Sequence, residues 1–181
     1  MTDTENAQQF IALMRGLRQV RQFHTGQIPQ EVLHDVLEVA RWTGSAGNSQ
    51  PWEFVVLRNR ETLKALSQLE GVGQLAEADA AIVIVMPGDT ERAEITSYDE
   101  GRVTERIMLA AAAHGVAASI GMFRGSGIEV ARTLLGIPAH LLVRTSISLG
   151  YANVEALRSR PKQGRKPLSE LVYEERYVPH N

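Results

Sequence analysis

Apolar residues recur at helical spacing in the first part of the chain and predict two long helices there. The first helix covers about residues 6–18 and carries an apolar stripe on one face: Phe10, Leu13, Met14 and Leu17. The second begins near Pro29, which suits a first helical turn, and its apolar stripe runs from Val32 to Ala40. Gly44 follows where a glycine can close this helix.

A third long helix is predicted from Ser97 to Gly115. Ser97 and Glu100 have the spacing of a capping box, in which each side chain satisfies a backbone N–H of the first turn. Asp99 and Glu100 are adjacent carboxylates, but neighbouring helix residues point in different directions, so capping is favoured over an acid–base pair. Shorter helical patterns cover residues 60–69 and about 127–135.

Four further segments have the pattern of β-strands. Continuous apolar runs at residues 54–57 and 80–86 predict strands that are buried on both faces. A strand of small residues is predicted at about 117–122. Residues 141–149 alternate between Val143, Thr145, Ile147 and Leu149 on one side and Arg144, Ser146 and Ser148 on the other, which predicts one buried and one polar face.

Together these elements predict a mixed sheet of four to five strands flanked by helices, in a single domain over residues 1–181. Residues from about 155 to 181 hold many charges and little periodic pattern, which indicates an extended C-terminal arm. The helices are too hydrophobic to be left uncovered, which favours a homodimer.

Composition removes several classes of function. The net charge of −2 gives no basic excess of the kind that nucleic-acid-binding domains carry, so no nucleic acid is expected as a partner. The absence of cysteine excludes disulfides, thiolate metal sites and thiol nucleophiles. The start of the chain is polar rather than signal-like, and the uncharged stretch 107–123 is too short and too rich in glycine and alanine to cross a membrane. We therefore expect a cytoplasmic protein.

Two weak motifs carry little chemistry. Gly71 to Ala76 matches a dinucleotide-binding fingerprint in form, but it follows a helical segment rather than a strand, so it lacks the required context. The five histidines show no metal-ligand spacing, and no metal is predicted.

Three polar groups stand out against an otherwise apolar chain: Arg18 with Arg21, the loop from Ser45 to Gln50, and Arg165 with Lys166. Two cationic clusters suit a phosphate monoester, and a loop of hydroxyl and amide groups around glycine suits a flat polar heterocycle or a ribityl chain. Each group also has a simpler interpretation. The arginines can favour a helix end, the loop can be an Asx turn, and the basic run from Arg158 to Lys166 can be a solvated arm or a nucleic-acid patch.

A family resemblance gives these groups a common meaning. The chain resembles the nitroreductase family from about residue 13 to 177, in the order of that family's motifs. The segments that carry the resemblance are RQVRQF at 18–23, ARW at 40–42, SAGNSQPW at 45–52, ERIMLAAAAHG at 105–115, LGY at 149–151 and RKPLSEL at 165–171.

The resemblance implies a nitroreductase-like α+β fold that forms an extensive homodimer, with FMN bound at the subunit interface. Arg18, Gln19 and Arg21 are then expected at the phosphate and ribityl end, joined by Arg165 and Lys166 of a C-terminal arm. The loop residues Ser45, Asn48 and Gln50 are expected to face the ribityl chain and the isoalloxazine ring. Backbone groups of Ser119, Ile120 and Gly121 are expected near the reactive edge of the ring.

Three positions depart from the family's usual pattern. Serine is common where Gln19 stands, a basic residue where Leu17 stands, and proline where Gly44 stands. These departures leave the strength of the phosphate clamp open.

The expected chemistry is carried by the flavin rather than by catalytic side chains. NAD(P)H would reduce FMN and leave, and a small acceptor such as a nitroaromatic or quinone would then stack in the same slot, in a ping-pong scheme. Tyr98 or Phe123 could line that slot, with core packing as the other interpretation of Phe123. The alternatives are a flavin-dependent dehalogenase, a flavin-modifying relative and a non-catalytic FMN-binding protein. Neither the acceptor nor the preference for NADH over NADPH can be read from the sequence.

Overall fold

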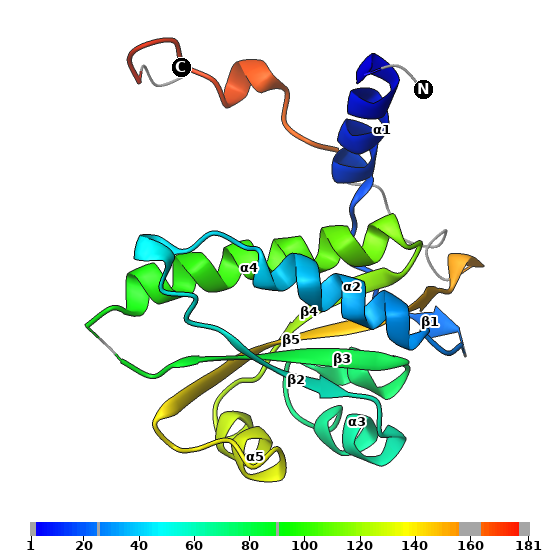
Figure 1. Ribbon diagram of the computed structural model, residues 1–181, viewed down its shortest axis with the longest axis vertical. Helices are drawn as coiled ribbons and strands as arrows, with labels where there is room; N and C mark the ends of the chain where they lie inside the picture. Colours follow the sequence, from blue (N-terminus) through cyan, green and yellow to red (C-terminus); the bar gives the residue numbers. More distant parts are fainter. Residues whose placement is uncertain (1–2, 25, 90, 156–163, 178–181) are drawn as a thin grey trace.

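The computed structural model describes residues 3–24, 26–89, 91–155 and 164–177. Its helices and strands, in chain order, are α1 (Asp3–Gly16), β1 (Phe23–His24), α2 (Gln30–Arg41), η1 (Ala46–Asn48), β2 (Glu53–Leu57), α3 (Arg60–Leu66), η2 (Gly73–Ala76), β3 (Ala80–Pro87), α4 (Ala93–Ala113), β4 (Ala117–Met122), α5 (Gly127–Leu134), β5 (Leu141–Ala152) and η3 (Leu168–Glu170). The predicted α+β fold is confirmed, with helices on both faces of the sheet (Figure 1).

The sheet is organised around β5, which pairs antiparallel with β1, β3 and β4, while β2 pairs antiparallel with β3. The pairings of these five strands are therefore antiparallel rather than mixed as predicted. Within the described residues, the parallel pairing is limited to an isolated bridge between Gln19 and Ala118. This bridge holds the segment after α1 against β4. It therefore places the Arg18–Arg21 segment beside the strand that contains Ser119 and Ile120.

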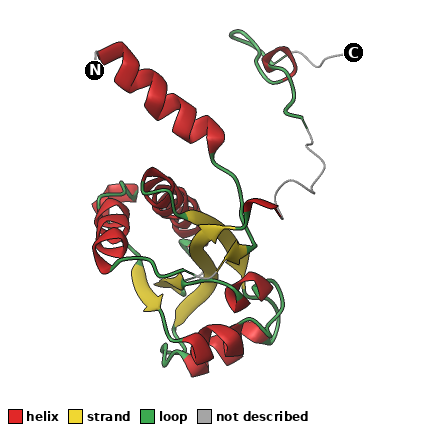
Figure 2. Cartoon of the chain, turned by 90° about the vertical axis from the view of Figure 1, so that its right-hand side faces the viewer, coloured by secondary structure: helices red, strands yellow, loops and turns green. Residues whose placement is uncertain are grey.

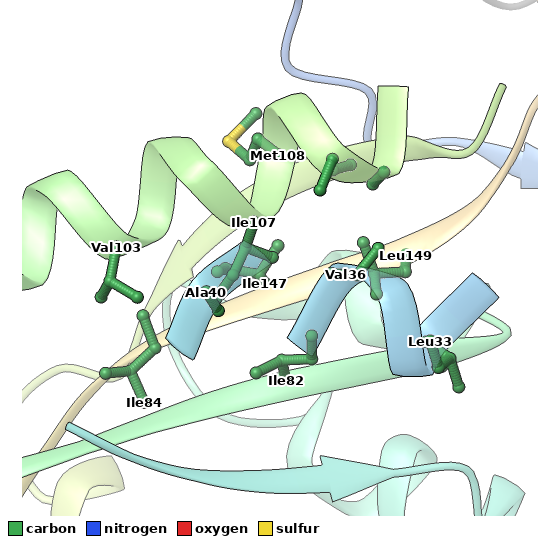
Figure 3. Packing of buried hydrophobic residues seen from close by; sticks show 14 of the residues in the cluster. Leu33, Val36, Ala40, Ile82, Ile84, Val103, Ile107, Met108, Ile147 and Leu149 are labelled. Carbon is green, nitrogen blue, oxygen red and sulfur yellow. The ribbon is translucent and has the colours of Figure 1, made fainter. Parts of the chain in front are cut away.

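Two layers of helices cover the sheet. On one face, α2 and α4 contribute Leu33, Val36, Ala40 and Ile107 to a core that includes Ile82, Ile147 and Leu149 of the strands (Figure 3). On the other face, α3 and α5 cover a second cluster that includes Leu63, Leu66, Val83, Ala131 and Val143. Figure 2 shows the helices on either side of the strands.

Two predictions about strand burial are wrong. The strand at 54–57 is not buried on both faces, because β2 pairs only with β3 within the described residues and Val56 remains 38% exposed at the edge of the sheet. The predicted polar face of β5 is also absent, since Ser146 and Ser148 are fully buried. They pair with Val83 and Ala81, which face the α3–α5 cluster, so this second layer covers the side that alternation assigned to solvent.

Two helix ends also differ from the sequence prediction. α4 begins at Ala93 rather than Ser97. Ser97 and Glu100 therefore lie inside the helix, where Glu100 is buried instead of completing a capping box. α2 ends at Arg41 with Trp42 as its C-cap, so Gly44 does not close it. Glu100 and Gly44 instead contact residues that are distant in the sequence, as described below.

α1 forms where the first helix was predicted and contacts α4, but much of its apolar face is exposed. Phe10 is 60% and Met14 is 40% exposed, and α1 projects from the body of the molecule (Figure 1). Residues 164–177 are also largely exposed and lie beyond the body near the same end. The rest of the predicted arm, including residues 156–163 and 178–181, lies outside the described residues. None of the described helices is long and apolar enough to cross a membrane.

Candidate functional site

A cavity of about 780 Å³ lies between the end of α1, the segment that follows it, and α4. It is lined by Met14, Arg15, Leu17, Arg18, Gln19, Glu105, Met108 and Arg165. Arg18 and Arg165 come from opposite ends of the chain, yet both guanidinium-bearing side chains reach this hollow. The Arg18 Nη1 atom donates to the carbonyls of Arg15, at 2.8 Å, and Leu17, at 2.7 Å, which holds the side chain beside the end of α1.

Gln19 connects this cavity to β4. Its Oε1 atom accepts a hydrogen bond from the Ile120 amide at 2.7 Å, and its Nε2 atom lies 3.7 Å from the Met108 sulfur. The bridge to Ala118 fixes the backbone at the same point. The Ile120 amide, which was expected near the reactive edge of a ligand ring, therefore already has an acceptor. A ligand that takes this amide must displace the Gln19 side chain.

The loop from Ser45 to Gln50 has an unusual backbone. Gly47, Asn48 and Gln50 adopt φ angles of 60°, 53° and 47°, in the left-handed region that non-glycine residues avoid. The Ser45 hydroxyl accepts from the Gln50 amide at 2.8 Å, and Gln50 Nε2 lies 3.4 Å from the Asn48 carbonyl. The loop is thus folded upon itself, with Asn48 and Gln50 exposed and Ser45 half-buried.

Asp99 and Arg102 of α4 anchor this loop, and sequence reasoning missed that role. Asp99 is 1% exposed, its Oδ2 atom accepts from the Ala46 amide at 3.1 Å, and its Oδ1 atom lies 3.6 Å from Arg102 Nη1. The interpretation of Asp99 as an ordinary capping residue is therefore wrong. A Cβ atom on Gly44 would lie 2.8 Å from Arg102 Nη2, so glycine leaves room for the guanidinium. Gly44 is far in the sequence from the Asp99–Arg102 ion pair of α4, so no local sequence pattern indicates that they are in contact.

The described chain brings only part of the predicted site together. Arg18, Gln19 and Arg165 line the large cavity, and Ile120 joins them through Gln19. Ser45, Asn48 and Gln50 do not line it, because Asp99 holds their loop against α4 about 9 Å before Glu105, the first residue of α4 that lines the cavity. Arg21 and Lys166 are exposed and do not line the cavity. Arg158, Arg160 and Lys162 of the basic run lie outside the described residues.

The two remaining predicted positions, Ser119 and Gly121, are buried in β4. The Ser119 carbonyl accepts from the Ser148 hydroxyl at 3.1 Å. A Cβ atom on Gly121 would lie 2.3 Å from Gln74 Nε2, so β4 packs tightly on the segment that contains the glycine-rich Gly71 to Ala76 motif. That motif follows α3 and enters η2, as expected for a segment that is not a dinucleotide fingerprint.

A second cavity, of about 220 Å³, borders Ile120 on the α4 side. It is lined by Ser97, Glu100, Gly101, Thr104, Glu105, Ile120, Met122, Arg144 and Thr145, so Glu105 lines both cavities. Of the two aromatic residues considered for a substrate slot, Phe123 is 2% exposed and packs in the core, and Tyr98 is 73% exposed on α4. Among the described residues, no group of histidines and carboxylates has the arrangement of a metal site.

Comparison with known proteins identifies relatives of this chain. The model of the nitroreductase family matches residues 14–85. The chain is 36% identical over 143 residues to a protein of Archaeoglobus fulgidus, "Putative NADH dehydrogenase/NAD(P)H nitroreductase", with 76% of this chain and 82% of that protein covered. A protein of Methanothermobacter thermautotrophicus with the same description is 30% identical over 139 residues, with coverages of 74% and 72%.

Solved structures share the fold. An FMN-dependent nitroreductase from Clostridium difficile superposes with a TM-score of 0.75 at 24% identity, covering 94% of this chain and 99% of that one. The NADPH:FMN oxidoreductase of Vibrio harveyi, solved in complex with NAD+, gives a TM-score of 0.80 at 20% identity, with coverages of 95% and 79%.

Proposed function

The chain belongs to the nitroreductase family, and on that premise we propose that it is an FMN-dependent oxidoreductase that uses NAD(P)H to reduce a small acceptor such as a nitroaromatic or a quinone. Relatives of this chain include proteins described as NAD(P)H nitroreductases, and solved structures with its fold include an FMN-dependent nitroreductase. The proposal extends these properties to the residues of this chain.

The observation that carries the proposal is the convergence of Arg18 and Arg165 on one large cavity. A phosphate monoester favours several charge-assisted hydrogen bonds, and guanidinium groups supply them in a fixed planar geometry. The cavity volume of about 780 Å³ lies within the range of roughly 300–1,000 Å³ that is usual for small-molecule sites. We therefore assign the phosphate of FMN to Arg18 and Arg165, with Gln19 beside the ribityl chain.

A second copy of the chain would complete this site. The loop residues Ser45, Asn48 and Gln50 do not line the cavity of their own chain. We propose that they face the flavin held by the partner subunit, in a homodimer that also covers the apolar face of α1. Arg21 and Lys166 are exposed in the single chain and are assigned to the same interface.

Bound FMN would supply the hydride and electron transfer, and the residues of the chain would bind and orient the reactants. Arg18 and Arg165 would fix the phosphate end. Gln19 holds the Ile120 amide, so a rotation of Gln19 would release a backbone donor to the ring edge. Donors at the position where a reduced flavin gains negative charge favour reduction. Reductant and acceptor would use the open side of the ring in turn, which gives ping-pong kinetics.

The proposal is tested by purifying the protein, recording the visible absorbance spectrum of bound flavin, and measuring steady-state oxidation of NADH and NADPH with a quinone and a nitroaromatic. Bound FMN and acceptor-dependent turnover with parallel double-reciprocal plots are expected. Colourless protein that takes up no added FMN contradicts the proposal. If the protein binds FMN but turns over none of the acceptors tested, it is instead a flavin-binding protein.

A further inference from the structure

Glu100 of α4 is a buried carboxylate whose hydrogen bonding is incomplete. Its side chain is 3% exposed, and its Oε2 atom pairs with Arg144 Nη2 of β5. Arg144 Nη2 also donates to the Ser97 hydroxyl at 3.2 Å. The other oxygen, Oε1, has no hydrogen-bond partner among the described residues. A buried charged oxygen without a donor is unfavourable, so the position calls for a partner from outside the described chain.

The same two side chains line a cavity. Glu100 and Arg144 both border the hollow of about 220 Å³ beside Ile120. Arg144 is 31% exposed on its side chain and so keeps donors toward open space. The Oε1 atom is itself buried in the single chain, so it meets a ligand in the cavity only when the carboxylate rotates, and the terminal torsion of a glutamate is broad. After that rotation an acceptor and a donor would lie next to each other in one wall.

A purely structural ion pair explains this arrangement less well. Such a pair would be expected to use both carboxylate oxygens on protein donors, because each oxygen left without a donor reduces the benefit of the pair. Glu38 and Arg41 show the alternative on the surface, where Arg41 donates to both oxygens of Glu38. At Glu100 one oxygen is left over, and it belongs to a residue that lines a cavity.

We propose that this cavity binds the amide or imide group of a planar ligand, with the ligand N–H donating to Glu100 and the ligand carbonyl accepting from Arg144. The inference rests on the proposed function. Two reactants in that function carry such a group: the carboxamide of the nicotinamide and the imide edge of the isoalloxazine ring. The cavity lies beside Ile120 and shares Glu105 with the cavity assigned to FMN, so either group would be within the same site.

The test compares ligands with and without the N–H donor. In one arm, the inhibition constants of NAD+ and its acetylpyridine analogue against NADH are measured with the holoenzyme. In this analogue a methyl ketone replaces the carboxamide. In the other arm, FMN and N3-methyl FMN are titrated into flavin-free protein. Each preference is measured for wild type, Glu100→Gln and the paired variant Glu100→Leu with Arg144→Met. The paired variant removes both members of the ion pair and so leaves no buried charge unpaired.

The wild type is expected to prefer the ligand with the N–H donor by about tenfold or more in one of the two arms, because hydrogen bonds to charged groups are the stronger ones. Both variants should reduce that preference to about twofold or less. In Glu100→Gln the side-chain oxygen stays toward Arg144 and the NH2 group takes the place of the unpaired oxygen, and in the paired variant leucine has no acceptor. Glu38→Gln, which alters an exposed ion pair outside the cavity, should leave it unchanged.

The arm in which the preference depends on Glu100 identifies the ligand. If wild type and both variants show the same preferences in both arms, the inference is wrong and the cavity holds something else, such as a side chain of the partner subunit. Wild-type protein that binds no FMN and oxidises no NADH would contradict the proposed function itself, which is a different result.

Discussion

Asp99 allows the proposed role of the loop from Ser45 to Gln50 in binding FMN to be tested by a single substitution. Its Oδ2 atom accepts from the Ala46 amide at 3.1 Å, and its side chain is almost fully buried. Asp99→Ala removes this acceptor. A hydrogen bond to a charged acceptor contributes about 1.5–3 kcal/mol, and the left-handed residues Asn48 and Gln50 store strain of about 1–3 kcal/mol each that the anchor helps to hold.

Without the anchor the loop should leave its folded conformation for most of the time. A loss of about 1.5–3 kcal/mol in the binding-competent conformation corresponds to an increase of about 10- to 150-fold in the Kd for FMN. The assay is a titration of flavin-free protein with FMN, followed by flavin fluorescence. Asp99→Asn keeps an oxygen acceptor for the Ala46 amide and should stay within about fivefold of wild type.

Asp35 offers a matched control, since it is an exposed carboxylate whose Oδ2 atom lies 3.2 Å from His114 Nε2. Asp35→Ala should leave the affinity for FMN unchanged. The reasoning is refuted if Asp99→Ala binds FMN as well as wild type. It is also refuted if Asp99→Asn is as weak as Asp99→Ala, because the ion pair with Arg102 would then matter rather than the loop hydrogen bond.

Three further predictions concern stability and assembly. Gly44→Ala should lower the free energy of unfolding in urea by under about 1 kcal/mol, because the new Cβ atom displaces only the flexible end of Arg102. In an Arg102→Ala background, Gly44→Ala should cost much less, whereas the same cost in both backgrounds would argue against the contact. Burial, opposed by the Gly26 amide, raises the pKa of Asp79. Its protonated form therefore favours folding, and the stability of wild type relative to Asp79→Asn should fall as pH rises from about 3 to about 7; a constant difference would contradict this. Phe10→Ser, at an exposed position of α1 that does not line the cavity, should weaken dimerisation in sedimentation and lower the flavin content. An unchanged flavin-loaded dimer would show that α1 has no such role.

Local sequence patterns predicted the elements whose burial follows from the spacing of apolar residues within the element itself. α2 was predicted from its apolar stripe because that stripe faces a single layer of core, and β3 from its unbroken apolar run because it is covered on both sides. β2 has nearly the same composition as a central strand, yet it lies at an edge. Position in the sheet depends on pairing, which a single strand's sequence does not encode.

The candidate site was predictable only where a motif links residues that are distant in the sequence. The family resemblance groups Arg18, Gln19 and Arg165 from sequence alone, and all three line one cavity. Asp99 and Glu100 have the pattern of ordinary residues at a helix start, because their true partners, the Ala46 amide and Arg144, lie far away in the chain. The start of α4 was also misplaced, because Ser97 and Glu100 have the spacing of a capping box but lie inside a helix that begins at Ala93.

The phosphate clamp is the claim on which the proposed function depends most. It is tested most directly by comparing the affinities of FMN and riboflavin, which differ only in the phosphate, for wild-type protein and for Arg18→Ala and Arg165→Ala. Wild type should bind FMN at least about 100-fold more tightly than riboflavin, and either substitution should reduce this ratio to about tenfold or less. Equal affinity of wild type for the two flavins, or a ratio that survives both substitutions, would contradict the assignment of Arg18 and Arg165 to the phosphate of FMN.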